Sequence, residues 1–184
     1  MPNLYQTALA ELAVVFDRLD DSEVDKACQM IASAKKIVVF GGGRERLQIM
    51  GFAMRLYHMG LAVAVEGDMT TPPVGQGDLF VVTCGPGEIS TALALMGVAK
   101  QAGAEILFIT AQPKGRGAAF ADFTLLLPAQ TMADDQGEKR SSVLPMGSLF
   151  EGALFVLFEI MVLKLINSMK IKPEDMRANH TNLE

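Results

Sequence analysis

The stretch from Asp78 to Thr91 constrains the fold most strongly. Leu79 to Thr83 is a short apolar run bounded by polar and glycine residues, which predicts a buried parallel strand. Gly85-Pro86-Gly87 forces a turn, and the apolar residues that follow Glu88 have helical spacing. Open α/β proteins hold ligands at such a turn, and the N–H groups at the start of the helix favour an anion. A turn without any ligand gives the same pattern.

A second unit of this kind comes earlier in the chain. Lys36 to Phe40 predicts a strand that runs into Gly41-Gly42-Gly43. The next helix is predicted from Glu45 to Met59, with inward-facing residues at Leu47, Met50, Gly51, Met54 and Tyr57. The glycine spacing fits neither the dinucleotide-binding nor the phosphate-loop pattern, so a nucleotide ligand is not predicted.

The remaining segments continue the alternation of strands and helices. Further strands are predicted at residues 61–65, 105–110 and 123–127, with a short helix at 116–121. The fold class is therefore α/β, with a five-stranded, mostly parallel sheet and helices on both faces. We expect one domain over residues 1–184: N-terminal helices at 3–34, an αβα core at 36–127, a long polar loop at 128–146, and a C-terminal helix and tail at 147–184.

Composition excludes several classes of partner. The net charge is −5 and no run of Lys or Arg occurs, which argues against nucleic acid. The apolar stretch at 149–166 contains Glu151, Glu159 and Lys164, which argues against a membrane span. The two cysteines form no disulfide framework or metal-ligand pattern, and the N-terminus lacks a signal-peptide pattern. A cytoplasmic protein without a bound metal is expected.

Several longer motifs resemble a known family. They are Gly51 to Leu56, Gly67 to Pro72, Pro145 to Glu151, and the ending His180-Thr-Asn-Leu-Glu184. With these motifs the chain resembles a sugar isomerase (SIS) domain, and within that family the 6-phospho-3-hexuloisomerase branch. The resemblance implies a three-layer αβα sandwich of the flavodoxin/Rossmann-like kind, commonly tetrameric. It also implies the interconversion of aldose and ketose phosphates without metal or cofactor.

The chain departs from this family where a phosphate would bind. The family usually reads Gly-Arg-Ser-Gly after the first strand and Ser-Gly-Ser-Gly-Glu-Thr after the central strand. Here Glu45, Cys84, Pro86 and Ile89 stand at hydroxyl positions, and Ser90 keeps a hydroxyl nearby. A thiol is a weak donor, and proline has no N–H to offer a phosphate oxygen. The substrate-binding residues implied by the resemblance are Gly43, Arg44, Glu45, Cys84, Gly85, Pro86, Gly87, Glu88, Ile89 and Ser90.

The catalytic positions implied by the resemblance are Glu151 and His180. Isomerisation through an enediol needs one group that takes a proton from carbon and returns it, and a carboxylate partly buried at a helix start suits this role. His180 would move a proton to or from a sugar oxygen, in its own site or in a neighbour's. Alternatively, Glu151 is an ordinary first-turn carboxylate and His180 is a solvated histidine of a polar tail.

Two functions follow from these features. The first is a sugar or sugar-phosphate isomerase that uses an enediol intermediate, has an altered phosphate-binding turn and forms a homodimer or homotetramer. The second is a non-catalytic SIS module that binds or senses a sugar. In both cases the expected ligand is a sugar or a sugar acid, and no membrane or nucleic acid is involved.

Overall fold

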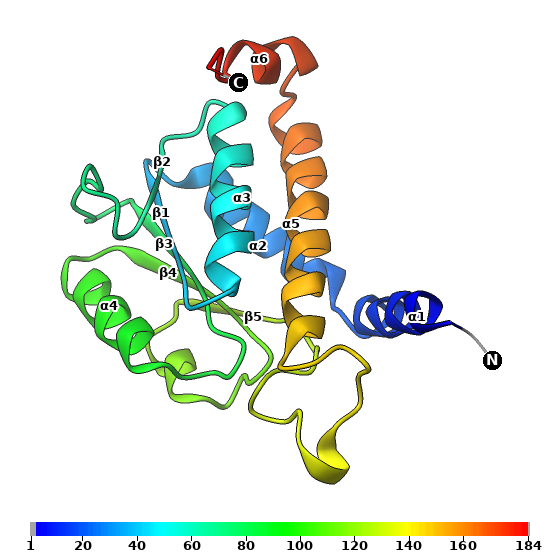
Figure 1. Cartoon of the computed structure of the whole chain (residues 1–184). Helices are drawn as coiled ribbons and strands as arrows, with labels where there is room; N and C mark the ends of the chain where they lie inside the picture. The colour runs from blue at the N-terminus through cyan, green and yellow to red at the C-terminus, as the bar shows by residue number, and fades with distance from the viewer. Residues whose placement is uncertain (1–2, 184) are drawn as a thin grey trace.

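The computed structural model describes residues 3–183, and a parallel sheet forms its centre (Figure 1). Its five strands lie in the order β2-β1-β3-β4-β5, and all four pairings are parallel. The strands are β1 (Ile37–Gly41), β2 (Val63–Val65), β3 (Leu79–Thr83), β4 (Glu105–Thr110) and β5 (Phe123–Leu126). The predicted five-stranded α/β sheet is confirmed.

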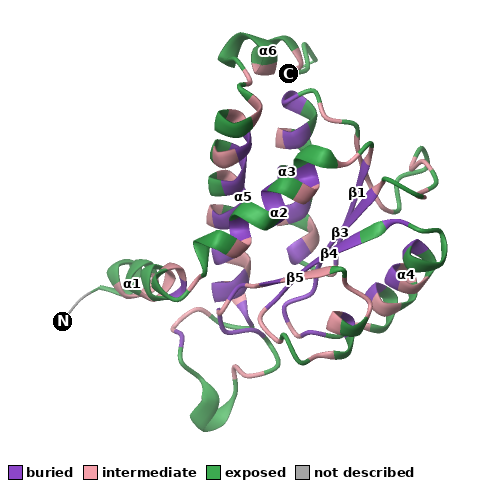
Figure 2. Cartoon of the chain, turned by 180° about the vertical axis from the view of Figure 1, so that it is seen from behind, coloured by how far each residue is buried: buried purple, intermediate pink, exposed green. Residues whose placement is uncertain are grey.

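Helices cover both faces of the sheet because the residues of β3 alternate between two cores. Leu79 and Val81 pack with one core, which also contains residues of α2 (Asp21–Ser33), α3 (Glu45–His58) and α5 (Ser148–Met169). Phe80 and Val82 pack with the other, together with α4 (Ser90–Gln101) and with Phe120 and Ala121, which follow the short 3₁₀ helix η1 (Arg116–Ala119). Figure 2 shows the buried strands between these two layers.

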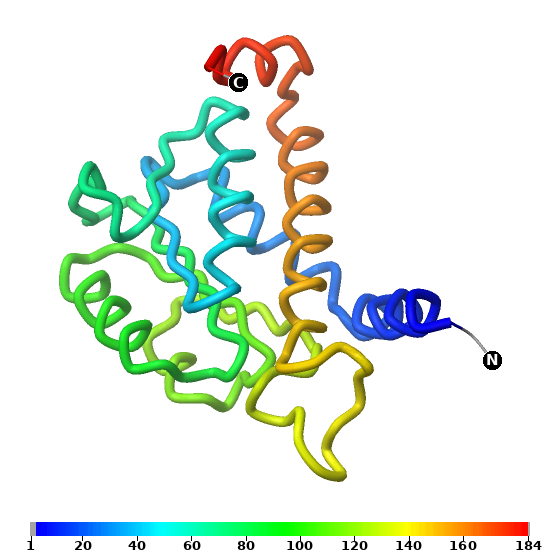
Figure 3. Tube along the Cα trace, viewed as in Figure 1, coloured from blue at the N-terminus to red at the C-terminus, as the bar shows by residue number. Residues whose placement is uncertain are grey.

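Two helices lie outside the sandwich. The N-terminal helix α1 (Leu4–Asp17) projects from the side of the molecule near the start of α5 (Figures 1 and 3). The C-terminal helix α6 (Pro173–Ala178) lies beyond the far end of α5. We expected only a polar tail there. A helix forms because Pro173 occupies a first-turn position and the acidic Glu174 and Asp175 suit a helix N-terminus.

The inward face predicted for α3 is wrong. Ile49, Phe52, Ala53 and Leu56 are the apolar residues that this helix buries. All five residues expected inside are exposed instead, namely Leu47, Met50, Gly51, Met54 and Tyr57. Both faces of α3 carry apolar residues, so periodicity alone could not identify the face that packs on the sheet.

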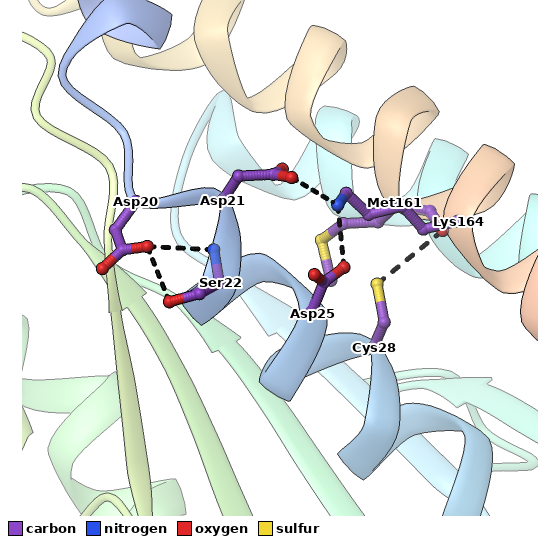
Figure 4. Close-up of polar contacts among 7 residues, drawn as sticks. All are labelled: Asp20, Asp21, Ser22, Asp25, Cys28, Met161 and Lys164. Carbon is purple, nitrogen blue, oxygen red and sulfur yellow. Dashed lines mark hydrogen bonds and ion pairs between the residues drawn. The ribbon is translucent and has the colours of Figure 1, made fainter.

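The helix pair α2 and α5 is held by a charged contact outside the apolar core (Figure 4). Lys164 Nζ lies 2.8 Å from Asp21 Oδ2 and 2.7 Å from Asp25 Oδ1. Asp20 caps the start of α2 by accepting a hydrogen bond from the Ser22 N–H at 2.9 Å. The two ion pairs therefore link the surface of α2 to α5, and the Asp20 contact caps the start of α2.

The start of α5 is fixed by a tight backbone approach. Gly147 has a φ of +75°, and a Cβ atom there would lie 2.8 Å from the Met132 nitrogen. Only glycine meets both conditions easily. The first turn of α5, with Glu151, is thereby held against the loop that follows β5. None of the helices within residues 3–183 combines the length and apolarity needed to cross a bilayer.

Candidate active site

Two glycine turns meet at the carboxyl edge of the sheet. β1 and β3 are neighbours with Gly41 opposite Thr83, so the turns that follow them lie side by side. The Gly85 N–H donates to Glu45 Oε1 at 3.0 Å and joins the two turns directly. Strand order reverses here, because β2 lies on one side of β1 and β3 on the other. Ligands of open α/β sheets bind at such a switch point.

A cavity of about 280 Å³ opens between these turns and the start of α5. Its walls come from three segments far apart in the sequence. They are Gly42, Gly43, Arg44 and Glu45 after β1; Pro86 and Ile89 after β3; and Thr131, Met132, Met146, Gly147, Phe150 and Glu151 from the long loop and α5.

Arg44 connects the first turn to the start of α5. Its Nη1 donates to Ser148 Oγ at 3.0 Å, and its Nη2 donates to the Met146 carbonyl. Nη2 also lies 3.2 Å from Glu151 Oε1. The guanidinium is half-exposed whereas the Glu151 side chain is 17% exposed, so the charge pair stands at the cavity wall.

The Glu151 carboxyl is placed in the first turn of α5 and lines the cavity. Partial burial raises its pKa above the ordinary value, and the positive charge of Arg44 opposes that shift. A carboxylate with a raised pKa is a stronger base than one in water, which is what abstraction of a proton from carbon requires.

Glu45 is the second carboxyl at the cavity, and it is 7% exposed. Burial raises its pKa to about 7, against the opposing hydrogen bond from the Gly85 N–H. The Glu151 charge raises it further. The Thr83 hydroxyl lies close enough to lower the pKa, yet Glu45 Oε2 and Thr83 Oγ1 make no hydrogen bond of normal geometry.

The ten predicted substrate-binding positions divide into two groups. Those that line the cavity are Gly43, Arg44, Glu45, Pro86 and Ile89. The other five do not line it: Cys84, Gly85 and Gly87 are buried within the turn, whereas Glu88 and Ser90 are exposed at or just before the start of α4. Burial raises the pKa of Cys84 to about 12, so its thiol stays protonated at neutral pH.

The structure does not bring His180 to this cavity within one chain. His180 follows α6, and its ring lies 5.0 Å from the ring of His58 at the end of α3. Glu151 stands in the first turn of α5, a helix of 22 residues that rises about 33 Å. The two groups are therefore at opposite ends of the molecule (Figure 1).

Residues from the long loop were missed by the sequence analysis. Thr131 and Met132 of this loop line the cavity, but no motif pointed to them, whereas Phe150 lies within the motif from Pro145 to Glu151. That motif was the one available sequence signal for this part of the cavity, because residues next to Glu151 in the chain must form the cavity wall beside it. Within residues 3–183 no three His, Cys, Asp or Glu side chains gather as a metal ion would require.

No family model matches the chain, but solved structures do. A Methanococcus jannaschii protein, for which a function of 3-hexulose-6-phosphate isomerase was inferred, has a TM-score of 0.84 and 26% identity over 97% of both chains. An Escherichia coli protein in complex with a sugar phosphate has a TM-score of 0.78 and 19% identity, over 97% of this chain and 94% of that one. The fold and the cavity at its switch point define a sugar isomerase (SIS) domain.

The curated relatives give the family. A 3-hexulose-6-phosphate isomerase of Mycobacterium gastri is 36% identical over 95% of this chain and 86% of that protein. One of Bacillus subtilis is 31% identical over 90% of this chain and 89% of that protein. The chain belongs to the family of 3-hexulose-6-phosphate isomerases, and it is an isomerase of the SIS fold.

Proposed function

We propose that this chain isomerises a 3-hexulose 6-phosphate, with Glu151 as the base. The observation that carries the proposal is the position of the Glu151 carboxyl, which lines the switch-point cavity and lies 3.2 Å from Arg44. The choice of sugar is supported by the relatives, which are named 3-hexulose-6-phosphate isomerases. The resemblance to the family supports the same choice of base.

The reaction moves a carbonyl group between neighbouring carbons. In a 3-hexulose the carbonyl is at C3, so one step through an enediol shared with C2 gives a 2-ketose. Glu151 takes the C2 proton, and an enediolate forms across C2 and C3. The same carboxyl then returns the proton to C3, while the hydroxyl proton of O2 passes to O3 and the carbonyl forms at C2. The Arg44 guanidinium stabilises the negative charge of the enediolate oxygen. This reaction shares the enediol step of an aldose–ketose conversion.

The test is solvent deuterium incorporation into fructose 6-phosphate, the 2-keto isomer of such a substrate. Glu151→Gln keeps the size of the side chain but cannot accept the proton. We expect nearly unchanged binding and a rate of incorporation at least about 100-fold lower. His180→Ala should lower the rate less, since His180 assists proton transfer at oxygen rather than at carbon.

Glu159→Gln is the matched control, because Glu159 lies on the same helix and faces Arg55 at 3.5 Å instead of the cavity. It should incorporate deuterium at the rate of the parent protein. Equal rates for the parent and Glu151→Gln would discard Glu151 as the base. Binding of the sugar phosphate without any incorporation would support the second function below.

The second function is a sugar-sensing module without catalysis. It is favoured by one observation: Glu45, Cys84, Pro86 and Ile89 replace the hydroxyl residues that the resembled family carries at these turns. Restoring serine at the first three positions and threonine at the fourth should tighten sugar-phosphate binding, since a hydrogen bond to a charged group contributes about 1.5–3 kcal/mol.

Assembly and location are further parts of the proposal. We propose a homodimer or homotetramer in which apolar residues of α1, α3 and α5 are covered, because several of them are exposed in the single chain. A cytoplasmic location is supported by Cys28 and Cys84, which are both free thiols.

A further inference from the structure

The protein's own Glu45 carboxyl occupies part of the turn that would hold a ligand anion. Glu45 Oε1 accepts the Gly85 N–H at 3.0 Å, so this backbone donor is already used. The next residue, Pro86, has no N–H to offer. The turn after β3 therefore offers a ligand no backbone N–H at Gly85 or Pro86. The Glu45 carboxyl lies there instead, beside the cavity.

The second oxygen of this carboxyl makes no hydrogen bond of normal geometry among the described residues. Glu45 Oε2 is buried without a hydrogen bond, and so is the neighbouring Thr83 Oγ1. Within residues 3–183, Arg44 is the one cation that lines the cavity, and it is bound to Met146, Ser148 and Glu151. A negative charge on Oε2 therefore has no hydrogen bond of normal geometry and only the nearby Thr83 hydroxyl to stabilise it. A ligand phosphate at the cavity would add a second negative charge nearby.

We propose that Glu45 is protonated whenever the cavity holds a sugar phosphate, so that binding takes up one proton from solvent at Glu45. The proposal rests on the proposed function, because it assumes that the ligand carries a phosphate. The proton on Oε2 removes the like charge. It also creates an O–H donor, which bonds to Thr83 Oγ1 or to a phosphate oxygen.

The other charged groups at the cavity do not produce this effect above pH 7.5. Arg44 is held by Met146, Ser148 and Glu151. Cys84, which adjoins Glu45, has a pKa of about 12, and a sugar phosphate is already a dianion. Glu88 is exposed at the start of α4. Glu151 on α5 is the remaining carboxyl at the cavity, and a variant of Glu45 separates its contribution.

The experiment is calorimetry of fructose 6-phosphate binding in buffers of different ionisation enthalpy, which counts protons taken up. At pH 8.5 the parent protein should take up close to one proton per site, and its affinity should fall almost tenfold from pH 8 to pH 9. Glu45→Gln keeps an oxygen for the Gly85 N–H but cannot ionise. It should take up no proton and bind with equal affinity at both pH values.

Glu105→Gln is the matched control, because Glu105 is exposed at the amino end of β4. It should behave as the parent does. If Glu45→Gln unfolds, Glu45→Ser tests the same point, and thermal unfolding without ligand checks both variants. Binding by the parent without proton uptake, or full uptake in Glu45→Gln, would overturn the role proposed for Glu45. Either result would leave the proposed function standing. Absence of binding from pH 6 to pH 9 in the parent and in Glu45→Gln would overturn the proposed function together with it.

Discussion

At the scale of the residue, Glu45 is an ionisable carboxyl in a buried position. Burial raises its pKa to about 7 from an ordinary value near 4.5. A raised pKa means that the carboxyl keeps its proton up to a higher pH in the folded state than in the unfolded state. The stabilisation from that proton is complete below the unfolded pKa and is lost as the pH rises through about 7.

Glu45→Gln should therefore gain stability over the parent as the pH rises. Because one pKa unit corresponds to about 1.4 kcal/mol, the difference in free energy of unfolding should grow by about 2–3 kcal/mol between pH 5 and pH 8.5. Urea unfolding at the two pH values measures it. Glu105→Gln, at an exposed position, should follow the parent. A difference that does not change with pH would contradict the assigned pKa.

Much of the cavity could be predicted at this scale, but its central contact could not. The motif around Arg44 and the segment that ends at Glu151 both pointed to residues that line the cavity. The bond from the Gly85 N–H to Glu45 joins residues 40 positions apart and depends on the register of β1 against β3. Spacing within each turn carries no information about that register.

At the scale of the element, strands were easier to predict than helix faces. β3 and β4 have the predicted bounds, because each is an unbroken apolar run that ends at a turn. α3 was assigned the wrong face, since its exposed side is also apolar. The helix α6 was missed because a six-residue polar segment has no periodic signal.

The turn after β3 depends on Gly87, which offers a test at the same scale. Gly87 has a φ of +84°, and a Cβ there would lie 2.7 Å from Gln112 Cβ and 3.0 Å from the Gln112 carbonyl oxygen. Gly87→Ala should therefore lower the free energy of unfolding by about 2–4 kcal/mol, from overpacking and the left-handed backbone together. Chemical denaturation measures the loss.

Gly137→Ala separates the two causes. Gly137 has a φ of +61° but no atom within 4 Å of an added Cβ, so only the backbone cost of about 1–2 kcal/mol applies. Equal losses for the two variants would mean that the close approach of the turns after β3 and β4 contributes nothing.

At the scale of the whole molecule, the separation of Glu151 from His180 has a consequence for assembly. Most of the exposed large apolar residues lie along α1, α3 and α5, and they include Leu4, Tyr5, Leu9, Leu47, Tyr57, Phe155 and Leu163. Because His180 lies far from the cavity of its own chain, a part in proton transfer would require the cavity of a neighbouring copy.

We predict that the protein forms a homodimer or homotetramer in which His180 of one copy serves the cavity of another. Glu151→Gln and His180→Ala, each impaired alone, should then complement each other when they are co-expressed. Random pairing makes half of the dimers hybrid, and each hybrid has one site with both groups, so roughly a quarter of the parent rate should return. The measurement is deuterium incorporation by the mixed preparation.

The control replaces the Glu151→Gln chain by a chain that carries both substitutions. Mixed with His180→Ala, it supplies no His180, so the rate should stay at or below that of His180→Ala alone. Mass spectrometry under native conditions verifies that hybrids form in both mixtures. Hybrids without a gain in rate would restrict His180 to a structural role at the end of α3, where it packs against His58. A stable monomer at micromolar concentration in sedimentation would refute the assembly itself, because the apolar residues of α1, α3 and α5 would then remain exposed to solvent.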